Sequence, residues 1–594
     1  MQYEEIRRQV LGAIREAQAR GLIHGTSGNI AVRQPGGDVV AITPSGRPYD
    51  TMQPEDIAIV TLDGEWIDGP YRPSSETPMH TAVYRARPDV GATVHTHALY
   101  STVMAMGLDE LPPSTPPQAE FAPMRVVPFA VPGSEELADY VTGALGADGL
   151  AVLLRNHGNF CCGKDIGAAM TAAVYLNGEK LAQHKGGYST FRVDLTDHLQ
   201  EENLLAISVD NSDNDTVYPQ KADFTFYGGL YRDVTLHIVP AEHFALPANG
   251  APALKATPIV TDLAAKTVEV TLEAAVVGAQ SVTFALEGQA LTAPVENGTA
   301  TAVFTLDHAH LWDGIDDPFL YTVSAKLDNG EEASARFGCR KFEIDPQKGF
   351  FLNGRSYPLR GVSRHQDRKD AGIALTNEMM EEDIALILEI GANTIRLAHY
   401  QHAQHFYDLC DEKGLVIWAE IPYITMHMTN GRANTLTQME ELIRQNYNHP
   451  CIAVWGLSNE ITAASAVNED LLENHRLLNE LAHKLDPTRK TTMANVFMLG
   501  IDSPILEIPD VNSYNLYFGW YLGELEQNDE FFDKYHADYP DRCIGLAEYG
   551  ADANPQYQSS HPEKGDYTES YQCIYHEHMA RMIADRPWLW ATHA

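Results

Sequence analysis

Short apolar runs alternate with helical segments from about residue 346 to the end of the chain. Runs of this kind are typical of parallel strands, which helices cover on both faces of the sheet. Eight runs with intervening helices predict a (β/α)8 TIM barrel over residues 346–594. The predicted strands are 357–364, 393–398, 415–421, 453–458, 491–496, 511–516, 542–547 and 587–592. Because the chain ends close to the last run, at Ala594, we expect a barrel truncated in its last strand.

Two of these runs lead directly to a carboxylate. Asn459 and Glu460 follow one run, and Glu548 follows another. Active sites of such barrels form at the carboxyl ends of the strands, so the two carboxylates are expected to face one site. Hydrolysis of a glycosidic bond uses such a pair, with one acid protonating the leaving oxygen and one carboxylate attacking the sugar carbon. Further polar or aromatic residues at predicted strand ends are His365, His399, Glu420 and Tyr517.

Alternation of apolar and polar positions replaces this pattern between residues 174 and 345. An Asn-Gly pair at 177–178 predicts a hairpin turn, and strands are predicted at 188–195, 203–210 and 231–239. We interpret residues 174–240 as a partial β-sandwich. Residues 241–345 are predicted to form a second all-β domain, an immunoglobulin-like sandwich, from the number and spacing of their strands.

The first 173 residues predict a separate α/β domain that begins with an amphipathic helix. His95 and His97 lie two positions apart in an apolar run, so a strand would point both side chains to one face. His157 follows another apolar run. Three imidazoles with an open fourth position are typical of a catalytic zinc site. Turns rich in Gly, Ser and Thr at 24–30, 43–50 and 72–80 are either ordinary loops or an anion cradle.

Composition narrows the classes of function. The formal net charge of −39 disfavours binding to nucleic acid or to anionic lipid. The sequence contains no apolar run long enough to span a membrane, and its start is not typical of a signal peptide, so we expect a cytoplasmic protein. Seven cysteines, an odd number without a Cys-x-x-Cys pair, are expected to be reduced thiols.

Residues 1–173 resemble the class II aldolases of the L-fuculose-phosphate aldolase family, which is related to adducin. The resemblance implies Zn²⁺ held by His95, His97 and His157, with Glu76 as the proton-transfer group. The sugar-phosphate contacts that it implies are Thr26, Asn29, Ser45, Gly46, Ser74 and Ser75. It stops at residues 169–173, so the C-terminal part of this domain is expected to be missing.

Residues 174–594 resemble the family 2 glycoside hydrolases, specifically the β-galactosidases. The segments that carry the resemblance are 349–355 (GFFLNGR), 360–365 (RGVSRH), 395–400 (IRLAHY) and 448–450 (NHP). It implies a retaining mechanism with Glu460 as acid/base and Glu548 as nucleophile, their carboxyl groups about 5–5.5 Å apart. The galactose contacts that it implies are Asp223, His365, His399, Asn459 and Tyr517.

A magnesium site is not expected beside this sugar site. Family members that bind Mg²⁺ use a Glu and a His just after the third barrel strand, and Ile424 and Met426 occupy those places here.

The preferred interpretation from sequence is a retaining β-galactosidase that cleaves terminal β-D-galactosides, joined behind a truncated aldolase-like domain. Three alternatives stay open. The first is a zinc-dependent sugar-phosphate aldolase, and the second is a β-glucuronidase, because glucuronidases share the two carboxylates. The third is an inactive hybrid chain. The expected partner is a small carbohydrate or a sugar phosphate, and the expected assembly is a homo-oligomer.

Overall fold

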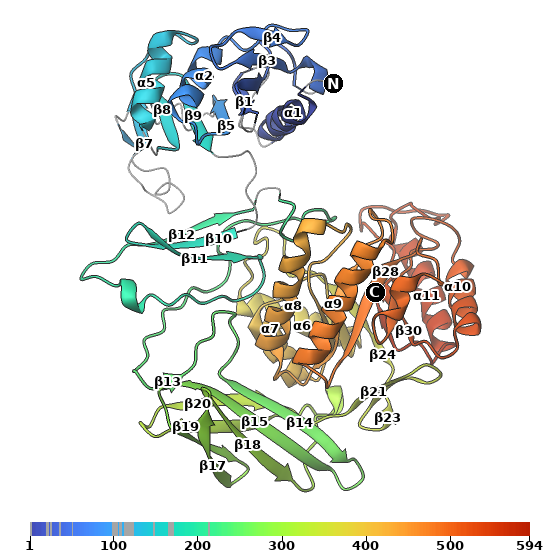
Figure 1. The fold of residues 1–594 in the computed structure, drawn as a ribbon. Coiled ribbons are helices and arrows are strands. Elements are labelled where there is room, and N and C mark those ends of the chain that lie inside the picture. Colours follow the sequence, from blue (N-terminus) through green and yellow to red (C-terminus); the bar gives the residue numbers. More distant parts are fainter. Residues whose placement is uncertain are drawn as a thin grey trace. The chain divides into compact units, whose positions relative to one another are not determined.

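The structure is a computed structural model (Figure 1). It describes residues 3–19, 23, 27–34, 37–49, 51–97, 105, 110–111, 124–146, 149–163, 171–211 and 214–594. The chain divides into two compact units, which we call unit 1 (residues 1–183 and 195–213) and unit 2 (residues 184–194 and 214–594). Each unit has hydrophobic clusters of its own. Among the predicted site residues, Thr26 lies outside the described residues.

Unit 1 contains a nine-stranded sheet with helices on both faces. The helices are α1 (Glu4–Ala19), α2 (Thr77–Ala86) and α5 (Glu135–Leu145), with a short 3₁₀ helix at Pro54–Asp56. The strands are β1 (Asn29–Arg33), β2 (Val39–Ile42), β3 (Ala58–Thr61), β4 (Trp66–Asp68), β5 (Ala92–Thr96), β6 (Glu110–Leu111), β7 (Met124–Val127), β8 (Ala151–Leu154) and β9 (Gly158–Gly163), in the order β4-β3-β2-β1-β5-β9-β8-β7-β6.

Period-two alternation assigns the two faces of this sheet. In β1, Ile30 and Val32 pack in one cluster with the apolar side of α1, whereas Ala31 packs in another cluster with residues of α2 and α5. The predicted amphipathic helix at the start of the chain is thereby confirmed as α1.

The Asn-Gly hairpin is also confirmed. It joins β10 (Thr171–Leu176) to β11 (Glu179–Lys185), and β12 (Leu205–Asp210) completes a three-stranded sheet after the 3₁₀ helix Thr196–His198. Asn177 and Gly178 have φ angles of 54° and 87°, as a type I′ turn requires.

The strands predicted at 188–195 and 231–239 are wrong, because neither segment forms a strand in the structure. Their alternating sequence finds no neighbouring strand among the described residues, so the ladder hydrogen bonds that define a strand are not made. Val234, Leu236 and Ile238 consequently stay 64%, 73% and 89% exposed.

Residues 243–337 fold around a single apolar core made by antiparallel strands. The strands are β13 (His243–Phe244), β14 (Leu254–Asp262), β15 (Thr267–Val277), β16 (Ser281–Leu286), β17 (Gln289–Glu296), β18 (Thr299–Leu306), β19 (Tyr321–Leu327) and β20 (Glu332–Phe337). Hydrogen bonds connect seven of them in the order β13-β15-β18-β17-β16-β19-β20, β14 pairs with β15 beside this path, and the sheet curls into a nearly closed barrel. The β17–β18 pairing covers only Val295–Ala300 and Glu296–Thr299, so it acts as the corner between two facing halves.

The predicted parallel barrel is confirmed, and it is closed. Its strands are β24 (Leu359–Arg364), β25 (Thr394–Leu397), β26 (Val416–Glu420), β27 (Ile452–Asn459), β28 (Lys490–Val496), β29 (Asn512–Asn515), β30 (Ile544–Glu548) and β31 (Ala591–His593). A small sheet of β21 (Phe342–Asp345), β22 (Gly349–Leu352) and β23 (Arg355–Ser356) precedes them.

The expectation of a barrel truncated in its last strand is wrong. β31 pairs with β24 through Leu359–Ala591 to Gly361–His593 and with β30 through Leu546–Thr592. Ala594 extends the ladder, because its N–H donates to the carbonyl of Gly361 and its carbonyl accepts from Ser363. Three residues are enough for β31 to close the barrel, because β24 and β30 satisfy the backbone groups of β31 on both sides.

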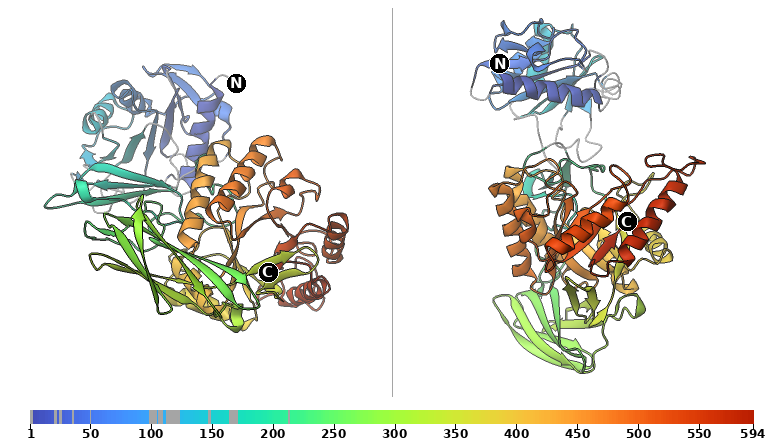
Figure 2. Two further views of the ribbon diagram at one scale, coloured as in Figure 1. Left: turned by 60° about the horizontal axis from the view of Figure 1, so that its bottom comes forward. Right: turned by 90° about the vertical axis from the view of Figure 1, so that its right-hand side faces the viewer.

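Helices surround this barrel on the outside, and α8 and α9 lie side by side (Figures 1 and 2). The helices are α6 (Asn377–Glu389), α7 (Gln404–Lys413), α8 (Arg432–Asn446), α9 (Glu469–Leu485), α10 (Glu526–Asp538) and α11 (Glu569–Ala584), with 3₁₀ helices at Gly314–Asp316, Thr429–Gly431 and Pro504–Glu507. Thr376 caps α6, since its side chain accepts from the N–H of Met379. Among the described residues, no helix is long and apolar enough to cross a membrane.

Candidate active site and metal cluster

Arg396 of β25 is the centre of the polar network at the carboxyl end of the barrel. Its guanidinium is fully buried and donates to Glu548 at 2.5 Å and to Glu420 at 2.8 and 3.1 Å. It also donates to Asn459 Oδ1 at 2.9 Å. A buried cation needs such anionic partners, and it fixes where the carboxylates lie.

Glu460 and Glu548 are brought to this network by β27 and β30. Asn515 connects Glu460 to Asn459, since its Nδ2 atom donates to Glu460 Oε1 at 3.0 Å and to Asn459 Oδ1 at 3.1 Å. Tyr517 donates its hydroxyl to Glu548 Oε2 at 2.8 Å. The charge of Glu548 acts on Glu460, so the two carboxylates lie near each other.

The two carboxyl groups differ in pKa because their surroundings differ. Burial and the nearby negative charge of Glu548 raise the pKa of Glu460 above its ordinary value. Burial by itself would raise the pKa of Glu548. The charges of Arg396 and His399 and the hydrogen bond from the Tyr517 hydroxyl outweigh burial and lower this pKa. Glu460 therefore keeps its proton to higher pH than an ordinary glutamate, and Glu548 stays ionised to lower pH.

His365 and His399 lie on the same rim. Their ring centroids are 5.0 Å apart, and His399 Nδ1 is 2.8 Å from Glu420 Oε1. Burial and the neighbouring His399 lower the pKa of His365 to about 4, so this imidazole is neutral at neutral pH. Asp223 is exposed but close enough for its charge to act on His365, so the structure brings it to the mouth of the site.

Arg396, Asn515 and Phe224 were not among the predicted site residues. Phe224 packs against the rings of His365 and His399 at centroid distances of 5.0 and 5.9 Å. A signal existed for Arg396, because a cation inside an apolar strand needs a buried partner. No comparable signal marks Asn515 or Phe224, since their positions depend on strand pairing and on the packing of residues 214–240.

Unit 1 contains a second cluster, formed by Glu76, His95, His97 and His157. Each residue offers one ligand atom, and these atoms all lie within 4.8 Å of one another. The three imidazole rings are mutually 4.8 Å apart between centroids. Glu76 Oε2 and Oε1 lie 3.2 and 3.3 Å from His95 Nε2 and His157 Nε2.

This cluster fits a metal ion chemically. His95 Nδ1 is 2.8 Å from the carbonyl of Asn159, which leaves its Nε2 atom directed at the cluster, the arrangement typical of metal-bound histidines. Burial and the neighbouring histidines lower the pKa of His97 to about 4, so its ring is neutral, the state that a metal requires.

Two of the predicted sugar-phosphate residues of unit 1, Asn29 and Ser74, hydrogen-bond to Glu76 of this cluster. The N–H of Ser45 donates to the carbonyl of Arg72, and that of Ser74 donates to the carbonyl of Thr43, so the loops that carry Ser45, Gly46, Ser74 and Ser75 run side by side. Asn29 donates to Glu76 Oε2 at 2.9 Å. In the structure Asn29 therefore orients the carboxylate.

Comparisons with known proteins match two families. Residues 8–183 match the class II aldolase and adducin N-terminal domain. Residues 252–340 match the glycosyl hydrolases family 2 domain, and residues 343–586 match the family 2 TIM-barrel domain. The crystal structure of an FMN-binding β-glucuronidase from Facaelibacterium prausnitzii L2-6 is 43% identical, with a TM-score of 0.68, and the match covers 72% of this chain and 68% of that one. The chain belongs to glycoside hydrolase family 2.

Other family 2 relatives carry either of two names. A β-glucuronidase of Bacteroides fragilis is 34% identical over 460 residues, which is 72% of this chain and 65% of the relative. A putative β-galactosidase structure from the same species is 33% identical with a TM-score of 0.68, covering 72% of this chain and 67% of that one. A β-galactosidase of Thermoanaerobacter pseudethanolicus is 31% identical, covering 59% of this chain and 47% of the relative. The chain thus spans about two thirds of the length of the B. fragilis β-glucuronidase and about half of the length of the T. pseudethanolicus β-galactosidase.

Proposed function

We propose that the barrel is a retaining β-glycosidase that hydrolyses terminal β-D-glucuronides. The observation that carries the proposal is the pair Glu460 and Glu548, which end two barrel strands and have opposite pKa shifts. Protonated Glu460 would donate to the leaving oxygen while ionised Glu548 attacks the anomeric carbon. Water would then release the sugar with Glu460 acting as base.

His399, Asn459 and Tyr517 support this assignment by their positions. Asn459 uses Oδ1 to accept from Arg396 and Asn515, so its N–H donors are the part of the amide suited to a sugar hydroxyl. Tyr517 and Arg396 stabilise the charge that Glu548 needs for attack. We assign Asp223 and His365 to the outer edge of the same sugar site.

The choice of a glucuronide over a galactoside rests on similarity. The relatives at 43% and 34% identity are named β-glucuronidases, whereas the β-galactosidase of T. pseudethanolicus is 31% identical over a smaller share of the chain. These comparisons favour the glucuronidase alternative over the galactosidase that sequence reasoning preferred. A β-galactosidase is the second candidate, supported by the putative galactosidase at 33% identity.

Nitrophenyl glycosides test this proposal. We expect kcat/KM for 4-nitrophenyl β-D-glucuronide to exceed that for the β-D-galactoside by at least about tenfold, which corresponds to about 1.4 kcal/mol of transition-state discrimination. Glu548→Gln is the control and should abolish turnover of both. Equal or reversed preference would reject the glucuronide, and turnover that survives Glu548→Gln would reject the site.

We also propose that unit 1 binds one zinc ion through His95, His97 and His157, with Glu76 beside it. The supporting observation is the convergence of four ligand atoms within 4.8 Å of one another, with the pKa values of His97 and His157 lowered by burial and by neighbouring histidines. A zinc ion there would polarise a sugar oxygen, and Glu76 is placed to move a proton. Aldol cleavage of a sugar phosphate is accordingly the candidate activity of this unit, since the loops at 45–46 and 74–75 lie beside Glu76.

Metal analysis of the purified protein tests this second proposal. We expect about one zinc per chain, and His97→Ala should release it. His198→Ala is the matched control, because His198 lies in the same unit, has a side chain that is 40% exposed and pairs with Glu179. Unchanged zinc content in His97→Ala would reject the site. Release of dihydroxyacetone phosphate from sugar phosphates would separately test the aldolase activity.

A further inference from the structure

The loops that follow β26 and β27 are joined to each other where the strands end. We call residues 421–431 the first loop and residues 460–468 the second loop. The N–H of Asn459 donates to the carbonyl of Tyr423 at 3.0 Å, and the N–H of Thr425 donates back to the carbonyl of Asn459 at 3.1 Å. Ala464 donates to the carbonyl of Thr425 at 3.0 Å. Because Asn459 and Ala464 lie on either side of Glu460 in the chain, the first loop fixes the backbone from which Glu460 projects.

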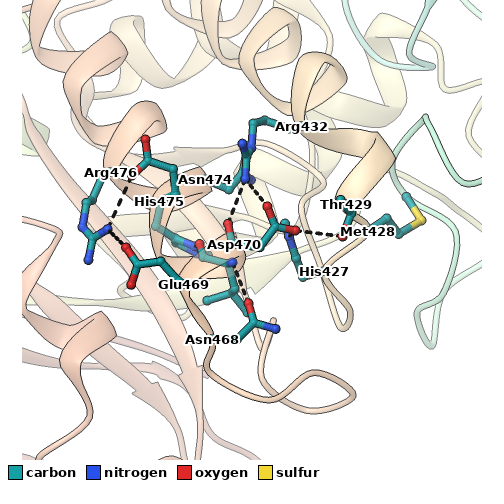
Figure 3. Close-up of polar contacts among 12 residues, drawn as sticks. His427, Met428, Thr429, Arg432, Asn468, Glu469, Asp470, Asn474, His475 and Arg476 are labelled. Atoms are coloured by element: carbon teal, nitrogen blue, oxygen red, sulfur yellow. Dashed lines mark hydrogen bonds and ion pairs between the residues drawn. The ribbon is translucent and has the colours of Figure 1, made fainter.

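The far ends of the two loops are joined by Asp470, in the first turn of α9 (Figure 3). Its Oδ2 atom is 2.9 Å from His427 Nε2 and accepts from the Thr429 hydroxyl at 2.8 Å. Arg432 pairs with its Oδ1 atom and donates to its backbone carbonyl at 3.1 Å. The Asp470 carboxylate therefore binds three side chains, those of His427 and Thr429 in the first loop and of Arg432 at the start of α8.

His427 connects this carboxylate to the interior of both loops. Its backbone N–H donates to Ser465 Oγ of the second loop at 2.8 Å, and its Nδ1 atom is 2.7 Å from the Tyr423 hydroxyl. The His427 side chain is only 5% exposed, so its pairing with Asp470 is partly shielded from solvent and is less screened than a surface ion pair. The contacts run without a break from Asp470 through His427 and Tyr423 to Asn459.

The neighbouring Glu469 makes a useful contrast. It occupies the same first turn of α9, but its carboxylate pairs with Arg476 of its own helix, and its side chain is 76% exposed (Figure 3). Among the described residues, it makes no hydrogen bond or ion pair with the first loop. The two acids thus have the same relation to the helix dipole, and only Asp470 connects the loops.

We infer that Asp470, with His427, Thr429 and Arg432, acts as a set of positioning residues for the acid/base Glu460. The inference rests on the proposed function, because it takes the acid role of Glu460 from there. Glu460 has a left-handed backbone conformation, with φ of 45°, which residues other than glycine rarely adopt and which the surrounding contacts must maintain. If the two loops separate, Glu460 is free to relax away from the leaving oxygen.

Asp470→Asn tests this role through two substrates of different leaving-group ability. The proton from Glu460 is needed for a phenyl glycoside, whereas a 2,4-dinitrophenyl group leaves without it. We expect kcat/KM for the phenyl glycoside to fall by about 10- to 100-fold, the effect of a misplaced catalytic group, and that for the dinitrophenyl glycoside to change by less than about threefold. Glu469→Gln, the matched control, should change neither.

Hydrogen exchange gives a readout that does not require turnover. The amides of Thr425, Asn459 and Ala464 should exchange at least about tenfold faster in Asp470→Asn than in Glu469→Gln, because their hydrogen bonds between the loops open more often. Thr429→Val, which removes a single donor, should act in the same direction and carries the test if Asp470→Asn does not fold.

The outcomes separate this inference from the proposed function. Equal losses on both leaving groups, or unchanged exchange of the three amides, would overturn the positioning role. A wild-type protein inactive on all glycosides would reject the proposed function, and hydrogen exchange would still decide whether Asp470 holds the loops together.

Discussion

Glu460 and Glu548 are the same kind of side chain at equivalent strand ends, and their neighbours shift their pKa values in opposite directions. Arg396 and Tyr517 both bond to Glu548, whereas Glu460 accepts from the neutral amide of Asn515. A cation and a hydroxyl donor stabilise a carboxylate, while burial near another negative charge favours the protonated acid. The division into acid and nucleophile is therefore decided by two or three contacts on each residue.

Glu460→Ala should separate substrates by leaving group. We expect kcat/KM to fall by about 10²- to 10⁴-fold for glycosides with poor leaving groups, because general acid catalysis contributes an effect of that size. Dinitrophenyl glycosides should be nearly unaffected in kcat/KM. An equal loss across a series of leaving groups would reject Glu460 as the acid.

Tyr517→Phe should move the acid limb of the pH profile. Activity requires Glu548 to be ionised, and its lowered pKa keeps it charged as the pH falls. Activity also requires Glu460 to be protonated, and its raised pKa moves the loss of that proton to higher pH. Removing the hydroxyl takes away one cause of the lowered pKa, so the acid limb of kcat/KM should shift to higher pH and the alkaline limb should stay. An unmoved acid limb would argue that this limb does not report Glu548.

At the scale of elements, irregular strand pairing occurs where site residues leave the barrel. The β27–β28 register shifts between Gly456 and Asn459, and the β29–β30 register shifts between Tyr514 and Asn515. Such irregularities re-aim side chains and are common beside active sites. Asn459, Glu460 and Asn515 thus point into one site, where Asn515 hydrogen-bonds to both of the other two.

Gly361→Ala should destabilise the barrel at the strand that closes it. A Cβ atom at Gly361 would lie 1.8 Å from the carbonyl oxygen of Thr394, and β24 cannot move away because it also pairs with β31. We expect a loss of about 1–3 kcal/mol, as overpacking causes.

Urea unfolding followed by tryptophan fluorescence measures this effect, since every tryptophan except Trp66 lies in unit 2. Gly550→Ala is the control, because nothing lies within 4 Å of a Cβ atom placed there. Identical midpoints for the two variants would contradict the predicted clash.

At the scale of the whole molecule, two units with separate cores carry separate sites. The cluster of Glu76, His95, His97 and His157 lies entirely in unit 1, and the network around Arg396 lies entirely in unit 2. Each site takes its neighbours from its own unit. Loss of one site therefore has no direct route to the chemistry of the other.

His95→Ala should leave glycosidase activity unchanged, with kcat/KM within about twofold of wild type, while the metal content of unit 1 falls. Both quantities can be measured on one preparation, and Glu548→Gln supplies the reverse control, with metal retained and glycosidase activity lost. Parallel loss of metal and glycosidase activity in His95→Ala would show that the two units depend on each other.

Local patterns were enough to predict much of this protein. The barrel strands follow from apolar runs bounded by polar strand ends, α1 from its amphipathic period, and the β10–β11 turn from Asn177 and Gly178. The convergence of Glu460 with Glu548 follows because the carboxyl ends of parallel strands meet at one rim, and that of His95 with His97 because residues two apart in a strand point to one face. These are properties of neighbouring residues and of regular geometry, so the sequence by itself determined them.

Only the tertiary structure decided features that depend on distant partners. The segments 188–195 and 231–239 alternate like strands but form none, because a strand requires hydrogen bonds from a neighbour that local sequence cannot supply. β31 closes the barrel because β24 and β30 lie on both sides of three residues. Arg396, Asn515 and Asp470 gain their significance from contacts that cross between strands and loops, and only packing brings such residues together.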